Sequence, residues 1–180
     1  MQRKSGKQKL TKMILALLMS VFVLMENTPV VLAEGNSCYA EYLAKKAAGV
    51  EIYEIVREDG VFMGYFEPYS ETNPEPAQAR TSSNIDWELP ANTHTCGVNT
   101  YYLTEDTRIN VSITQSPSGA GYAGYLGLKD ADTGYFSFYD GTISTNGWNG
   151  TLVVAYDGNF SFAIMNASNY SIRYTGSYSF

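Results

Sequence analysis

From residue 87 onward, apolar and polar residues alternate along the chain with a period of two. Residues 109–113 and 160–164 place an apolar side chain at every second position, and residues 172–180 do the same with Gly176 on the apolar side. This pattern is typical of antiparallel strands that pack one face on a core and expose the other to water. Short Asp, Asn, Gly and Pro clusters separate these segments. The pattern predicts a β-sandwich domain of about seven strands over residues 87–180.

Residues 34–66 are predicted to form a short helix and a β-hairpin. Residues 38–48 have helix-forming composition and apolar positions near the helical period, and Gly49 follows as the expected terminator. Residues 50–56 and 61–66 are β-branched or aromatic runs, and the Asp-Gly pair between them suits a hairpin turn.

Residues 67–86 contain three of the protein's six prolines among Ser, Thr, Asn and Glu. Such a stretch holds too little apolar surface to offset the entropy lost on ordering. We therefore expect a polar, proline-rich linker or a mobile surface loop here.

The first 33 residues are predicted to be a secretory signal peptide. Five basic residues precede a mostly apolar run at residues 13–25, and Ala33 supplies the small residue expected before cleavage. That run is shorter than the roughly 20 residues needed to cross a bilayer. The predicted product is secreted or loosely held at the cell surface, without stable membrane insertion.

Charge and cysteine content narrow the function classes further. Removing the predicted leader leaves 7 basic and 17 acidic residues, which disfavours nucleic acid as a partner. One His and two Cys are too few for a structural zinc site, and no cofactor is predicted. Because exported proteins meet an oxidising environment, we expect a disulfide between Cys38 and Cys96.

Two segments carry weak signals of metal or catalytic chemistry. Asp130 and Asp132 begin like a calcium loop, although a turn capped by Asp130 is the simpler interpretation. His94 lies two residues before Cys96, which permits a thiol and imidazole pair, but the expected disulfide would remove that nucleophile. The sequence therefore predicts that the protein is not an enzyme.

Exposed aromatic rings are the stronger candidates for ligand contact. Tyr125 and Tyr139 fall on the phase opposite to the apolar neighbours in their strands, and Trp148 lies in a Gly/Asn-rich loop. Such rings could stack on sugars or contact a partner protein. The alternative is that strands simply favour tyrosine.

The segment 159–168, followed by 172–178, resembles the closing strands of bacterial pre-peptidase C-terminal-like domains. A "Y-x-F-x-I-x-N" strand there leads through a polar turn into "V-x-G-x-Y", which is similar to NFSFAIMNAS and IRYTGSY here. Residues 103–114 resemble the opening of that family, and the likeness covers residues 95–180. It implies a jelly-roll-like β-sandwich that acts as a non-catalytic module. The whole arrangement also resembles small secreted Gram-positive proteins of unassigned function.

These features together predict a non-enzymatic, exported β-sandwich that interacts with a protein or glycan at the cell exterior. One alternative is a carbohydrate-binding module that uses Tyr125, Tyr139 and Trp148. Another is an accessory or inhibitor of a secreted hydrolase that acts through residues 34–86.

Overall fold

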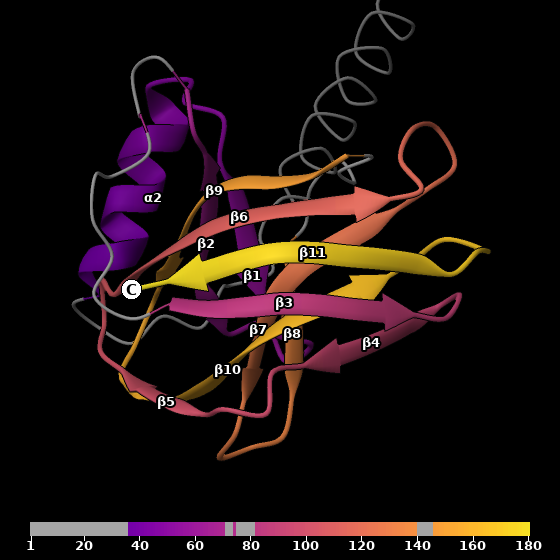
Figure 1. Cartoon of the computed structure of the whole chain (residues 1–180). Coiled ribbons are helices and arrows are strands. Elements are labelled where there is room, and N and C mark those ends of the chain that lie inside the picture. Colours follow the sequence, from indigo (N-terminus) through magenta and orange to yellow (C-terminus); the bar gives the residue numbers. More distant parts are fainter. Residues whose placement is uncertain (1–35, 71–73, 75–81, 140–145) are drawn as a thin grey trace, which may run out of the picture. The chain divides into compact units, whose positions relative to one another are not determined.

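Two antiparallel sheets pack face to face, with one helix beside them (Figure 1). The structure is a computed structural model that describes residues 36–70, 74, 82–139 and 146–180. The predicted signal peptide lies outside the described residues. The helix is α2 (Ser37–Ala47), and the strands are β1 (Tyr53–Val56), β2 (Phe62–Pro68), β3 (Ser82–Leu89), β4 (Thr93–Cys96), β5 (Tyr101–Leu103), β6 (Arg108–Ser116), β7 (Gly124–Asp130), β8 (Phe136–Phe138), β9 (Gly147–Val154), β10 (Gly158–Asn166) and β11 (Ile172–Ser179). The predicted antiparallel β-sandwich is confirmed.

Strand pairing in the sandwich is nested. One sheet has the order β1-β2-β9-β6-β11-β3, the other has the order β4-β10-β7-β8, and β5 also pairs with β10. From β3 onward, β3 pairs with β11, β4 with β10, β6 with β9 and β7 with β8. This is the pattern of one long hairpin wrapped around a core, which is a jelly roll.

The predicted hairpin is present and extends the larger sheet. β1 pairs with β2 across a turn in which Gly60 has a φ of 84° and donates its N–H to the Arg57 carbonyl. β2 then pairs with β9 from Gly64 to Pro68. The hairpin is thus built into the same sheet as the later strands. The two ends of segment 67–86 lie in β2 and β3, and much of the rest lies outside the described residues.

The predicted helix is also confirmed, with its ends stabilised by local hydrogen bonds. Asn36 caps α2, because its side chain accepts a hydrogen bond from the Tyr39 N–H at 2.8 Å. Beyond the last turn, Gly49 adopts a φ of 76°, as suits a helix terminator. The rings of Tyr39 and Tyr42 pack on Phe62, which joins the helix to β2.

The core lies between the two sheets and follows the predicted alternation. Ile109, Val111 and Ile113 of β6 are buried, and so are three apolar side chains on each of the two last strands: Phe160, Phe162 and Ile164 of β10, and Ile172, Tyr174 and Tyr178 of β11. Tyr174 of β11 is fully buried, and its ring stacks on Trp148 with the ring centres 5.6 Å apart. β11 lies between β6 and the edge strand β3, so its buried side chains hold β3 to the rest of the larger sheet.

Tyr174→Ala should therefore lower the free energy of unfolding by about 3–5 kcal/mol, because it removes a fully buried aromatic ring. Its neighbour Thr175 faces solvent, and Thr175→Ala should cost less than about 1 kcal/mol. Chemical denaturation of both variants measures the difference. Equal, small effects would contradict the place of β11 in the core.

Candidate ligand-binding groove

The smaller sheet has an outward face that is unusually rich in large apolar side chains. Phe160, Phe162 and Ile164 of β10 point into the core, so the alternate residues of this strand face outward. Directly paired residues share a face of the sheet. The pairings of Met165 with His94 and Tyr125, Gly127 with Phe138, and Lys129 with Phe136 therefore place seven residues on this face: His94, Tyr125, Gly127, Lys129, Phe136, Phe138 and Met165. Ser161 and Ala163 of β10 share the face but are covered, at 4 % and 0 % exposure.

This outward face is strongly curled. β4 and β8 are the two edges of the β4-β10-β7-β8 order, and three strand spacings would separate them by about 14 Å in a flat sheet. Even so, the ring centre of His94 on β4 lies 4.4 Å from that of Phe136 on β8 and 6.1 Å from that of Phe138. The sheet bends so that side chains from its two edges meet across the outward face.

Small residues permit this bend. Gly127 on β7 pairs with Phe138 on β8, and a Cβ at Gly127 would overlap the carbonyl oxygen of Ser137. Ala163 is its partner on β10 and is fully buried. A larger side chain at Gly127 would push β8 away from the sheet and separate the two edges.

A groove of about 630 Å³ lies at this meeting of the edges. We call it the ring groove. Met165 contributes from β10, and Glu58 and Val56 approach from the β1–β2 hairpin. The Nζ of Lys129 lies 5.5 Å from the ring centre of Phe136. The ring groove is lined by His94, Tyr135, Phe136, Phe138, Met165 and Glu58, together with Val56, Gly134 and Ser137.

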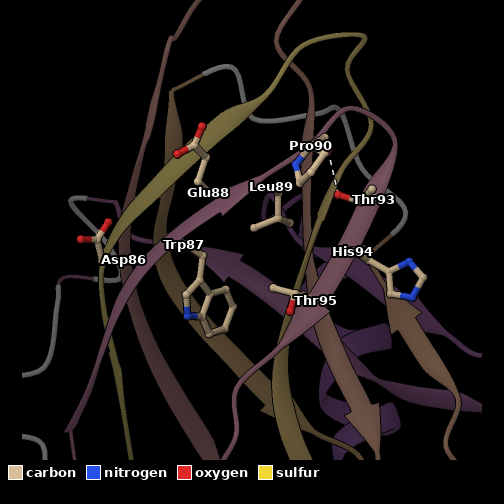
Figure 2. A pocket seen from close by; sticks show the side chains of 8 residues that line it. All are labelled: Asp86, Trp87, Glu88, Leu89, Pro90, Thr93, His94 and Thr95. Carbon is tan, nitrogen blue, oxygen red and sulfur yellow. Dashed lines mark hydrogen bonds between the residues drawn. The ribbon is translucent and has the colours of Figure 1, made fainter.

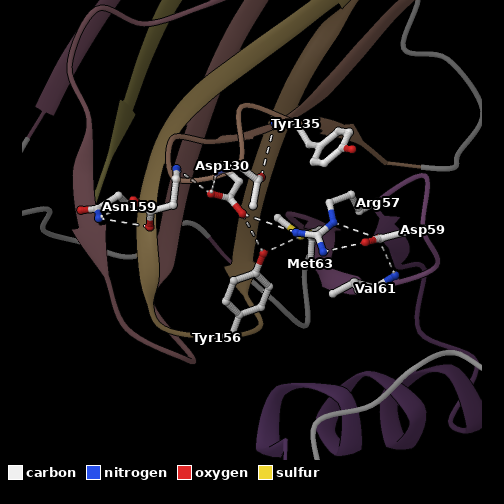
Figure 3. Close-up of polar contacts among 10 residues, drawn as sticks. Arg57, Asp59, Val61, Met63, Asp130, Tyr135, Tyr156 and Asn159 are labelled. Atoms are coloured by element: carbon white, nitrogen blue, oxygen red, sulfur yellow. Dashed lines mark hydrogen bonds and ion pairs between the residues drawn. The ribbon is translucent and has the colours of Figure 1, made fainter.

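A polar network fixes the β1–β2 turn beside the β7–β8 turn (Figure 3). Asp130 at the end of β7 is only 5 % exposed. One of its carboxylate oxygens accepts the backbone N–H groups of Asp132 and Thr133 at 2.9 and 3.2 Å. The other lies 3.5 Å from the Arg57 guanidinium and 3.4 Å from the Tyr156 hydroxyl. These contacts hold one wall of the ring groove in place.

The same contacts bear on the calcium hypothesis for Asp130 and Asp132. Both oxygens of Asp130 are engaged in capping the turn and pairing with Arg57, and Asp132 accepts hydrogen bonds from Asn159 at 3.2 Å. Across the part of the chain that the structure describes, no three His, Cys, Asp or Glu side chains are grouped to hold a metal ion. Asp130 therefore acts as the cap of a turn.

The prediction that Tyr139 and Trp148 contact a ligand is wrong. Tyr139 and Trp148 are 3 % and 4 % exposed, and the Trp148 indole N–H donates to the Tyr139 hydroxyl at 2.7 Å. Both rings are buried in the core and hydrogen-bonded to each other, so neither can face a ligand. Tyr125 is half-buried and does lie on the outward face, beside Met165.

The sequence missed Phe136 and Phe138 because their strand was assigned the opposite phase. A strand FSFY with outward tyrosine places both phenylalanines inside, as apolar residues usually are. In the structure Ser137 and Tyr139 face inward instead. The available signal was the small residue Gly127 on the paired strand, which leaves room for rings on the outward side.

The predicted disulfide between Cys38 and Cys96 is also wrong, since both are free thiols. The backbone N–H of Cys38 donates to Glu105, whose own N–H donates to Asp157, just before β10. Cys96 lies opposite Ala163, six residues farther along that strand. Six extended residues span about 20 Å, whereas a disulfide needs Cα atoms roughly 4–7 Å apart.

Comparisons with protein-family models, curated proteins and solved structures found no match. The likeness to pre-peptidase C-terminal-like domains thus stays a prediction. No helix among the described residues is long and apolar enough to span a membrane.

The two thiols should differ in reactivity. Burial, together with nearby acidic charges, raises the pKa of the Cys38 thiol to about 12, whereas Cys96 is partly exposed on β4. At pH 8 a maleimide should therefore label Cys96 alone in the native protein and both thiols after unfolding.

The free energy of unfolding should also fall as the pH rises above 9.0, because the Cys38 thiol ionises in the unfolded chain at a lower pH than in the folded protein.

Mass spectrometry of the labelled protein measures this difference, and Cys96→Ser is the matched control that should take up no label while folded. If the unfolded chain takes up no label and its mass is two hydrogens below that of the reduced protein, the two cysteines form a disulfide and this prediction is wrong.

Proposed function

We propose that this protein is an exported, non-catalytic binding module that holds a carbohydrate chain in the ring groove. The observation that supports this proposal best is the convergence of His94, Phe136 and Phe138 at an open groove. These rings come from opposite edges of a curled sheet, which presents them on a preformed scaffold.

The lining chemistry suits a sugar. The apolar faces of the Phe136 and Phe138 rings, stacked at 6.1 Å, can pack against the C–H groups of a pyranose ring, much as rings pack elsewhere. Glu58 and His94 supply hydrogen-bonding groups at the same groove. An apolar surface with a few polar groups that fix orientation is typical of small-ligand sites.

Charge narrows the class of carbohydrate. The sequence after the predicted leader has 7 basic and 17 acidic residues, and such a surface repels anionic polymers. The lining contains the carboxylate of Glu58. Neutral glycans are therefore the expected ligands.

Two further considerations support a binding role at the cell exterior. The leader-like residues 1–33 predict export, and the likeness to pre-peptidase C-terminal-like domains implies a non-catalytic module. Jelly rolls include lectin domains, although a fold alone does not assign a function.

Phe136→Ala should weaken binding of a neutral glycan by about tenfold or more, because it removes a central ring of the groove. Tyr102→Ala is the matched control: Tyr102 is 66 % exposed on β5 and does not line the groove. A glycan array followed by titration calorimetry measures the change, and thermal unfolding checks that both variants fold.

Failure of the wild-type protein to bind any neutral glycan, or binding equally weakened by Tyr102→Ala, would contradict this proposal. Hydrolysis of a glycan that His94→Ala abolishes would contradict the non-catalytic role.

A further inference from the structure

A second cleft opens on the other side of β4 from the ring groove (Figure 2). It has a volume of about 500 Å³ and lies between β3 and β4, the edge strands of the two sheets. Trp87 of β3 is half-buried along it, and Thr93 and Thr95 of β4 face it. We call this the Trp87 cleft.

His94 connects the two hollows, since it lines both of them. Figure 2 shows its imidazole pointing away from Trp87, toward the side where it meets Phe136. The Trp87 cleft and the ring groove therefore meet at His94 on the edge strand β4.

The lining of the Trp87 cleft matches a sugar in the same way as that of the ring groove. It combines the indole ring of Trp87 with the hydroxyls of Thr93 and Thr95, of which the Thr93 hydroxyl donates a hydrogen bond to the Pro90 carbonyl at 2.8 Å. Glu88 follows Trp87 on β3, and its side chain lies on the opposite, outward face of that strand (Figure 2). The neighbouring Asp86 carboxylate is paired with Arg173, with both N–O distances at 2.7 Å. The cleft thus offers a stacking surface and two hydroxyl oxygens that can accept hydrogen bonds from sugar hydroxyls.

We propose that the Trp87 cleft is a second subsite and that the ligand is an extended neutral polysaccharide chain lying across β4 at His94. This inference rests on the proposed function and specifies its ligand further. A single sugar fills one hollow, whereas a chain reaches both. Occupying two linked subsites with one ligand raises affinity without any new kind of contact.

The test compares neutral glucose and N-acetylglucosamine oligosaccharides of increasing length, from disaccharide to octasaccharide, by titration calorimetry on the full chain. Affinity should rise about tenfold or more once the chain is long enough to span both subsites. Trp87→Ala should remove that gain and leave disaccharide binding unchanged, because the ring groove is intact. Phe136→Ala should weaken short and long chains alike.

A measurement on the unmodified protein guards against misfolding of the Trp87→Ala variant. The protein has two tryptophans, and Trp148 is buried at 4 % exposure, so Trp87 is the indole that acrylamide can quench. A bound octasaccharide should protect Trp87 from quenching, whereas a bound disaccharide should not.

Equal affinity for short and long chains, or unchanged quenching with a bound octasaccharide, would overturn the second subsite. If Phe136→Ala still weakens binding in that case, the proposed function stands alone. If no oligosaccharide of any length binds, the proposed function fails as well. Capture of a purified protein partner in the groove, in place of a glycan, would overturn both.

Discussion

The contact between the two sheets decides how the outer surface of this protein is built. Phe160, Phe162 and Ile164 on β10 are buried between the layers. Because a strand alternates its faces, their burial turns Met165 and the fully covered Ala163 to the opposite face of the sheet. Because paired residues share a face of the sheet, the pairing of β10 with β4 and with β7 fixes which side chains of those two strands face outward. The hydrophobic core thus sets which way His94, Phe136 and Phe138 face, because each lies on a strand paired in this register.

Curvature turns that outward face into a place where a ligand can lie. Without Gly127 and Ala163 in the middle of the sheet, β8 could not approach closely enough for Phe136 to reach His94. The Arg57 and Asp130 contacts then tie the β1–β2 turn to the β7–β8 turn. Backbone shape, more than any single reactive group, defines this candidate site.

The sequence predicted the parts of the fold in which local pattern and tertiary burial agree, such as β6, β10 and β11. It missed β4, whose residues THTC carry no apolar alternation, and most of β3, where outward Ser, Asn, Asp and Glu resemble a linker. It could not place the candidate site, because the curl of a sheet depends on contacts between residues distant in sequence. Its disulfide rested on the expected compartment, which says nothing about whether two cysteines meet.

The nested pairing has a consequence for how the chain reaches its folded state. Because β3 pairs with β11, the first strand of the jelly roll stays without its neighbour in the sheet until β11 has been synthesised. Such a topology is dominated by non-local contacts, which slows folding. Until β11 is in place, the strand edges of β3 stay unpaired, and the chain depends on protection from premature aggregation.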